Sequence, residues 1–152
     1  MLKANFITAQ EAAEKIQDGS TLCTIGMTLV SASESILKAI EKRFETVGHP
    51  ADITLVHSCG QSDRKDGIQH LAHEGLVKRI VGSHWGLQPR WMEMIANSQV
   101  EAYCLPQGQI AQLYRSMACG LPGKMSKVGL GTFIDPRVEG GKMNDRTKPL
   151  PD

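Results

Sequence analysis

The chain has little of three things that often reveal a function at once: aromatic residues, an excess of charge of one sign, and long apolar runs. Aromatic residues make up 5% of its 152 residues, and 17 basic residues stand against 16 acidic ones. Balanced charge argues against a nucleic-acid binder, because that function needs a basic patch to meet the phosphates. No apolar run approaches the ~20 residues of a membrane-spanning helix. We therefore expect neither nucleic acid nor membrane as a partner.

Cysteine is scarce as well. The chain has four, Cys23, Cys59, Cys104 and Cys119, and no two of them form a Cys-x-x-Cys pair. That spacing indicates neither a zinc ribbon nor a redox motif. The first residues contain no secretory apolar region. These features predict a cytoplasmic protein with reduced thiols.

A complete set of metal ligands at recognisable intervals is also missing. His70 and His73 lie three residues apart on a predicted short helix, which is a spacing that metal sites use. No third ligand follows at a usual interval, however. The sequence therefore predicts no metal site.

Short β-rich segments alternate with helical ones along the chain. Helices are expected at 9–16, 32–46, 68–74, 89–97 and 107–119, and strands at 21–25, 53–57, 77–81 and 100–104, with a possible fifth strand at 127–133. Thr8 with Glu11, and Ser31 with Glu34, have the spacing of capping boxes at the first two helix starts. This alternation predicts one α/β domain: a Rossmann-like, open, mainly parallel sheet with helices on both faces.

What the sequence has in abundance is glycine, with 15 residues. Every expected strand is followed by a loop that contains it, and in parallel sheets ligands bind beyond the carboxyl ends of the strands. The densest stretch is 128–137 with 140–142, where Pro136 lies between Gly129, Gly131 and the pair Gly140–Gly141. Glycine allows positive φ and close approach of a ligand to the backbone. We interpret these loops as one wall of a binding site.

Four segments, in this order, resemble the first half of a family I CoA-transferase of the fused acetate or propionate type. They are 73–78, 82–85, 102–108 and 128–144. The family's signature after the first strand is only half present, because its Gly-Gly-Phe reads Gly26-Met27-Thr28 here. The resemblance implies the same Rossmann-like fold, with coenzyme A as a substrate and no further cofactor. It implies transfer of CoA from an acyl-CoA to a short-chain carboxylate, through a glutamyl-CoA thioester on the enzyme.

The resemblance also implies which residues bind substrate or CoA. These are Gly26, Gln107, Gly108, Gly129, Gly131 and Thr132. Gln107 and Gly108 open a helix, whose first N–H groups suit a carboxylate; the alternative is an ordinary helix start after Pro106. Gly129, Gly131 and Thr132 could offer backbone donors, or could belong to a bulged strand that needs glycine.

Three further features in these loops have two interpretations each. Gly140–Gly141–Lys142 could hold a CoA phosphate or form a charged turn. Arg137 is expected to pair with Asp135 rather than with a ligand. His84 and Trp85 could shape the pocket, or could be a hydrogen-bonded histidine and a packed aromatic ring.

The nucleophile of that family is missing. It is a glutamate in a Glu-x-Gly-x-x-Gly-Gly context in the second half, and the nearest matches here, Glu74–Gly75 and Glu139–Gly140–Gly141, lack that spacing. We therefore assign no catalytic residue and expect the chain alone to be inactive. Residues 1–152 are interpreted as a truncated, partial N-terminal domain with a flexible tail from 144 to 152. It would need a complementary second half, or a β-like subunit, that carries the catalytic glutamate.

Two other interpretations remain open. One is a stand-alone small-molecule-binding or regulatory module on a similar sheet, which rests on fold analogy. The other concerns assembly: unpaired sheet edges would make the chain a homo-oligomer.

Overall fold

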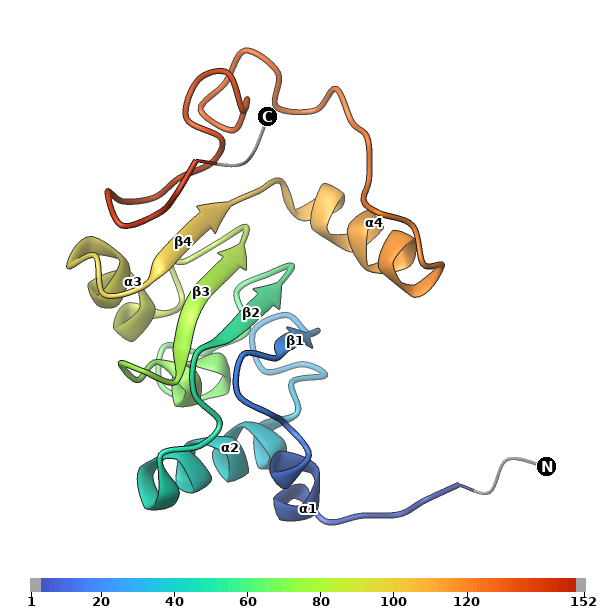
Figure 1. Cartoon of the computed structure of the whole chain (residues 1–152), viewed down its shortest axis with the longest axis vertical. Coiled ribbons are helices and arrows are strands. Elements are labelled where there is room, and N and C mark those ends of the chain that lie inside the picture. The colour runs from blue at the N-terminus through green and yellow to red at the C-terminus, as the bar shows by residue number, and fades with distance from the viewer. Residues whose placement is uncertain (1–3, 150–152) are drawn as a thin grey trace.

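Four parallel strands form one open sheet in the computed structural model, which describes residues 4–149. Their order across the sheet is β1-β2-β3-β4, the same as their order in the chain (Figure 1). The strands are β1 (Thr21–Thr24), β2 (Ile53–His57), β3 (Val77–Gly82) and β4 (Glu101–Cys104). The helices are α1 (Ala9–Glu14), α2 (Glu34–Val47), the 3₁₀ helix η1 (Gly67–Leu71), α3 (Pro89–Ala96) and α4 (Gln107–Ala118). The predicted α/β class is confirmed.

One face of the sheet carries the main core. When parallel strands follow one another in chain order, right-handed crossovers put every connecting helix on the same face. Here α1, α2, η1 and α3 share one apolar core with the sheet, in which Ile40, Leu55 and Ile80 are fully buried. Trp91 of α3 is also fully buried, and its indole N–H donates to the Ile68 carbonyl of η1 at 2.9 Å.

The opposite face is covered only in part. Its residues lie in one row across the strands: Cys23, Val56, Val81 and Tyr103. From α4, the Tyr114 hydroxyl reaches the carbonyls of Thr24 and Val56, at 3.3 Å each. Cys23 on β1 is exposed, and within the described residues β1 pairs with β2 alone. The β-rich composition of 21–25 predicts a buried strand, and the structure corrects this, because β1 is a half-exposed edge strand.

The other edge of the sheet is closed by the end of the described chain. Asn144 donates to the carbonyls of Ile95 and Val100 at 2.9 Å, and the Thr147 hydroxyl accepts from the Ala102 N–H at 2.8 Å. Thr147 is 2% exposed, and the Tyr103 hydroxyl donates to the Lys148 carbonyl. Residues 144, 147 and 148 thus supply hydrogen-bond partners beside the edge strand β4, whose backbone groups need them. The flexible tail expected from 144 to 152 stays a prediction. Residues 150–152 lie outside the described residues.

Several local predictions are confirmed and others are wrong. The capping box of Thr8 and Glu11 is present. The one at Ser31 is not: α2 begins at Glu34 after Ser33, whose side chain makes no capping bond, and the Glu34 carboxylate accepts the Gly67 N–H instead. The helix expected at 68–74 is the shorter η1.

The fifth strand expected at 127–133 is absent from the described residues. This stretch is a series of turns, in which Gly129 and Gly131 have φ of 93° and 77°. Left-handed backbone at alternate residues cannot maintain a strand, so the unusual conformations expected for this glycine-rich stretch are what exclude the strand.

Candidate functional site

A hollow of about 380 Å³ lies where three strands end and α4 begins. Parallel strands end at a common edge of the sheet, so the loops after β1, β2 and β3 meet there. The residues that line it are Met27, Thr28, Cys59, Gly60, Ser83, His84, Leu87 and Gln107. Of the predicted site residues, Gln107 lines this strand-end hollow directly, and Gly26 lies next to its wall.

Hydrogen bonds between the loops hold the rim of this hollow together. The Thr28 N–H donates to the Gly60 carbonyl at 2.8 Å, which joins the loops after β1 and β2. The Ser83 hydroxyl donates to the Ser58 carbonyl and so joins the loops after β2 and β3. Because each loop is fixed to its neighbour, the wall is formed before any ligand arrives.

Gly26 shapes this wall and does not line it. Its φ is 138°, and a Cβ at this position would lie 2.8 Å from the Val30 carbonyl oxygen. Met27 and Val30 exchange backbone hydrogen bonds of 3.1 and 2.9 Å across the turn that follows. Glycine is required here because the turn that presents Met27 and Thr28 folds back on it.

Gln107 is the first residue of α4, and Pro106 before it provides no side-chain cap. The helix N-terminus therefore offers uncapped backbone N–H groups and a partial positive charge beside the Gln107 amide. Gly108 lies in the same turn but is not among the residues that line the hollow, and a Cβ there would meet nothing within 4 Å. The arrangement can bind and orient a carboxylate.

His57 lies beneath the loops, and nothing in the sequence pattern singled it out. It is fully buried at the end of β2, with Nδ1 2.7 Å from the Cys59 carbonyl and its ring edge-on to Trp85 at 5.0 Å. Burial lowers the pKa of His57 to about 4, so the ring is neutral near pH 7. A carbonyl only accepts, so Nδ1 carries the proton and fixes the Cys59 carbonyl in place.

Gly82 is the signal that could have revealed His57. A Cβ at Gly82 would lie 2.3 Å from Nε2 of His57 and 2.9 Å from the Trp85 ring. The glycine at the end of β3 therefore makes room for the imidazole of the neighbouring strand. Trp85 packs against His57, which fits the interpretation as a packed aromatic ring. His84 lines the hollow, which fits the interpretation as a pocket residue.

A second hollow of about 220 Å³ lies between α4 and the segment 124–136. Most of its lining is apolar, and Gly129 is the only predicted site residue among the residues that line it: Leu105, Pro106, Gln109, Ile110, Leu113, Lys124, Ser126, Val128, Gly129, Leu130, Ile134, Asp135 and Pro136. The predicted set is therefore divided, with Gln107 in the strand-end hollow and Gly129 in this one.

Gly131 and Thr132 use their donors within the loop. The Gly131 N–H donates to the Asp135 carboxylate at 2.8 Å, and the Thr132 hydroxyl donates to the Gly129 carbonyl at 2.6 Å. These two residues hold the shape of the loop, and the donors that one interpretation assigned to a ligand are already engaged.

Asp135 is the centre of that loop. The Arg137 guanidinium donates to it at 3.0 and 2.7 Å, and the backbone N–H groups of Arg137 and Gly131 donate as well. These hydrogen bonds, the one from the Arg137 side chain first, hold the pKa of Asp135 well below its usual range. The expected pairing of Arg137 with Asp135 is confirmed.

The Gly140–Gly141–Lys142 segment is a turn along the edge of β4. The Gly141 N–H donates to the Phe133 carbonyl at 2.9 Å, and the Gly141 carbonyl accepts from Cys104 at 2.7 Å. A Cβ at Gly141 would lie 2.5 Å from the Cys104 carbonyl oxygen. The structure has the turn and not a phosphate cradle, because these glycine donors face the protein.

Comparisons with known proteins find relatives in sequence and in structure. The family model described as Coenzyme A transferase matches residues 6–151. Caffeate CoA-transferase of Acetobacterium woodii is 42% identical over 145 residues, which cover 95% of this chain and 28% of that protein. The alpha subunit of the acetate CoA-transferase of Escherichia coli strain K12 is 23% identical over 88% of this chain and 58% of its own length.

A solved structure also superposes. The acyl-CoA transferase YdiF of Escherichia coli O157:H7, solved as a thioester complex with CoA, matches with a TM-score of 0.87 and 37% identity. The match covers 93% of this chain and 28% of that one. The chain thus spans a little over a quarter of the length of the caffeate CoA-transferase and YdiF relatives. Within residues 4–149, no helix is long and apolar enough to cross a membrane.

Proposed function

This chain belongs to the coenzyme A transferase family, and we propose that, together with a complementary polypeptide, it moves CoA in the cytoplasm from an acyl-CoA to a short-chain carboxylate of the acetate or propionate class. The observation that carries the proposal is the strand-end hollow, where Gln107 and the N-terminus of α4 face the loops after three parallel strands.

In this proposal the chain binds and orients, and its partner carries out the bond-making. The Gln107 amide and the first N–H groups of α4 hold the carboxylate of the acid substrate. The tied loops around Thr28, Gly60 and Ser83 keep that carboxylate in one place, which is how positioned groups lower a barrier. The nucleophilic glutamate comes from the complementary polypeptide, and CoA is held on it as a glutamyl thioester.

The second hollow is proposed to receive a less polar part of the acyl-CoA. Its lining is mostly apolar, and Gly129 leaves its wall without a side chain at one point. Gly131 and Thr132 contribute by holding the loop in shape, and Gly26 does the same for the turn at Met27. Gly108 leaves the first turn of α4 unobstructed.

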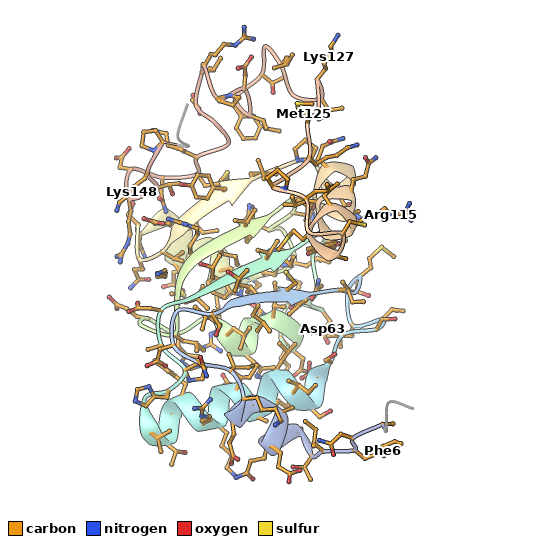
Figure 2. All side chains as sticks on the ribbon, turned by 45° about the vertical axis from the view of Figure 1, so that its right-hand side comes forward. Phe6, Asp63, Arg115, Met125, Lys127 and Lys148 are labelled. Carbon is orange, nitrogen blue, oxygen red and sulfur yellow. The ribbon has the colours of Figure 1, made fainter. Side chains whose placement is uncertain are left out.

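Exposed apolar side chains support a partner that covers the partly exposed face of the sheet, which we call its open face, and the loop after β1. Ile25, Met27 and Val30, in and next to the loop after β1, are 65%, 60% and 68% exposed, and Met125 is 96% exposed. Figure 2 shows Met125 and Lys127 projecting from the segment after α4, away from the sheet. Ile25, Met27 and Val30 lie close together, since Met27 and Val30 are hydrogen-bonded to each other, and an exposed apolar group of this kind suits a partner. In isolation we expect the β1 edge to pair with a second copy, which gives a homo-oligomer.

The test is a chimera in which this chain replaces the matching segment of the YdiF relative. With acetyl-CoA and labelled propionate, the purified chain alone should show no CoA exchange, and the chimera should show it. Gln107→Ala in the chimera should lower exchange by about 10²-fold, as removal of a positioned polar donor does. Gln10→Ala on α1 is the matched control and should leave exchange unchanged.

Two results would count against the proposal. One is exchange by the chain alone, and the other is a folded chimera in which Gln107→Ala has no effect. A stand-alone binding module would instead bind a carboxylate or CoA without the partner, and equilibrium dialysis of the isolated chain with labelled acetyl-CoA and propionate distinguishes it.

A further inference from the structure

Carboxylates from two segments surround one histidine on the far side of the main core. His70 of η1 is 13% exposed, and its Nε2 lies 2.8 Å from Oε1 of Glu34 and 3.5 Å from Oδ1 of Asp66. Glu34 belongs to α2, and Asp66 precedes η1. None of these residues lines the strand-end hollow, so they form a cluster separate from the candidate site.

The three ligand atoms are spaced as a small cation needs them. Zinc binds nitrogen and oxygen at about 2.0–2.1 Å, which places tetrahedral ligands about 3.3 Å apart. Here two separations are 2.8 and 3.5 Å, and all three atoms lie within 4.8 Å of one another. Small rotations of the half-buried carboxylates would bring them to coordination distance.

The other ring nitrogen of His70 is held as metal-binding histidines usually are. Nδ1 lies 2.5 Å from Oε2 of Glu41, and Oε1 of the same carboxylate lies 2.8 Å from Nε2 of His73. A carboxylate on the far nitrogen orients the ring and increases the basicity of the nitrogen that faces the metal. Arg90 lies 3.5 Å from Glu41 and holds it from α3.

A plain ion-pair network is the competing account. Lys38 lies 3.1 Å from Glu34 and 3.7 Å from Asp66, with its side chain 54% exposed. Without a metal, Nε2 must carry a proton to face these carboxylates, because ionised carboxylates only accept. That proton and the Lys38 ammonium each bring one positive charge to the carboxylates of Glu34 and Asp66. A single divalent cation would supply both charges. Lys38 is exposed and flexible enough to move away.

We propose that Glu34, Asp66 and His70 form a binding site for a first-row divalent cation, with Zn²⁺ as the probe and Glu41 as its positioning residue. The imidazole ligand favours zinc over Mg²⁺ and Ca²⁺, which prefer oxygen alone. An ion bound to these three residues links the start of α2 to η1 and so stabilises the packing of these two helices against each other. The sequence missed it because Glu34 lies 36 residues from His70, so that only Asp66 and His70 of the three ligands are close along the chain.

The experiment is a calorimetric zinc titration of the chain in a Cys23→Ser/Cys119→Ser background, which removes the two exposed thiols. We expect one equivalent to bind. His70→Gln should weaken binding at least about 100-fold, and Glu41→Gln about 10- to 100-fold. His49→Gln is the matched control, because His49 faces only Asp18 at 2.9 Å, and it should leave binding unchanged.

Lys38→Met separates the two accounts. If the cluster binds metal, removing the competing ammonium should tighten zinc binding several-fold. If it is only an ion-pair network, the variant should show no zinc binding and a lower melting temperature. Circular dichroism checks that each variant folds. If His70→Gln does not fold, the two single variants Lys38→Met and Glu41→Gln decide between the accounts. No saturable binding below about 100 μM, or equal binding by His70→Gln, overturns the site.

Discussion

The two faces of the sheet differ in how completely this chain covers them. On one face, α1, α2, η1 and α3 enclose a continuous core. On the other, α4 and the segment 142–148 reach only part of the row that runs from Cys23 to Tyr103. The difference follows from strand order, because an unbroken 1-2-3-4 series sends every crossover to one side. One face of the sheet thus carries a continuous core, while the other stays partly exposed from Cys23 onward.

The largest effect on stability should come from disrupting the core on the face of the sheet that the helices cover. Trp91→Ala removes a fully buried ring and its hydrogen bond to Ile68. We expect a loss of about 3–5 kcal/mol in the free energy of unfolding, measured with urea. Met92→Ala, on the same helix but half exposed, is the control and should cost under about 1 kcal/mol. A Trp91→Ala chain as stable as the native one would mean that the core is not where stability resides.

The next largest effect should come from crowding His57, which lies where the core meets the strand-end loops. Gly82→Ala would place a methyl group 2.3 Å from the His57 imidazole, so one of the two must move. Overpacking of this kind costs about 1–3 kcal/mol. Gly108→Ala, which meets nothing within 4 Å, should instead be neutral or stabilising by up to about 1 kcal/mol. Equal thermal shifts for the two variants would contradict this contrast.

A pH effect should follow from the same histidine. The pKa of His57 is lowered to about 4 in the folded chain, so the unfolded chain takes up a proton first as the pH falls below about 6.5. Stability is therefore complete above that pH and decreases toward pH 4, by about 2 kcal/mol between pH 7 and pH 5. Urea unfolding at both pH values measures it. A His57→Gln chain should lose this part of the pH dependence, and an unchanged slope would argue against a buried neutral ring.

The smallest effect should come from the open face of the sheet. Cys23→Ser on β1 should change the free energy of unfolding by no more than about 0.5 kcal/mol, because the side chain is exposed. Its thiol should react freely with a water-soluble maleimide in the isolated chain and slowly in the YdiF chimera. Equal labelling rates in the two would show that the complementary polypeptide does not cover this face.

Much of the fold could be predicted from local patterns. The four strands and the helix that begins at Gln107 lie within one or two residues of where periodicity places them. The capping box at Thr8 is local chemistry and was predicted correctly. The second failed because Glu34, although correctly spaced from Ser31, is drawn to Gly67 and His70. A long-range partner displaced the local one.

The candidate site was predictable in part for the same reason. Gln107 and the loop at Met27 could be expected to meet, because parallel strands end at one edge. One of the two interpretations of Gly131 and of Gly141 had them offer donors to a ligand, yet their N–H groups are engaged by Asp135 and Phe133. Glycine content reports unusual backbone; it does not report which way the N–H groups point.

By itself the sequence determined the four strands, most of the helices and their parallel arrangement, because periodicity and capping are local properties of the chain. It indicated the family through the resemblance of four segments. Only the tertiary structure decided which face is covered, that β1 is an exposed edge while β4 is closed by Thr147, and that Glu34, Glu41 and Asp66 gather around His70. Those outcomes depend mostly on contacts between residues about thirty or more apart, which spacing along the chain does not encode.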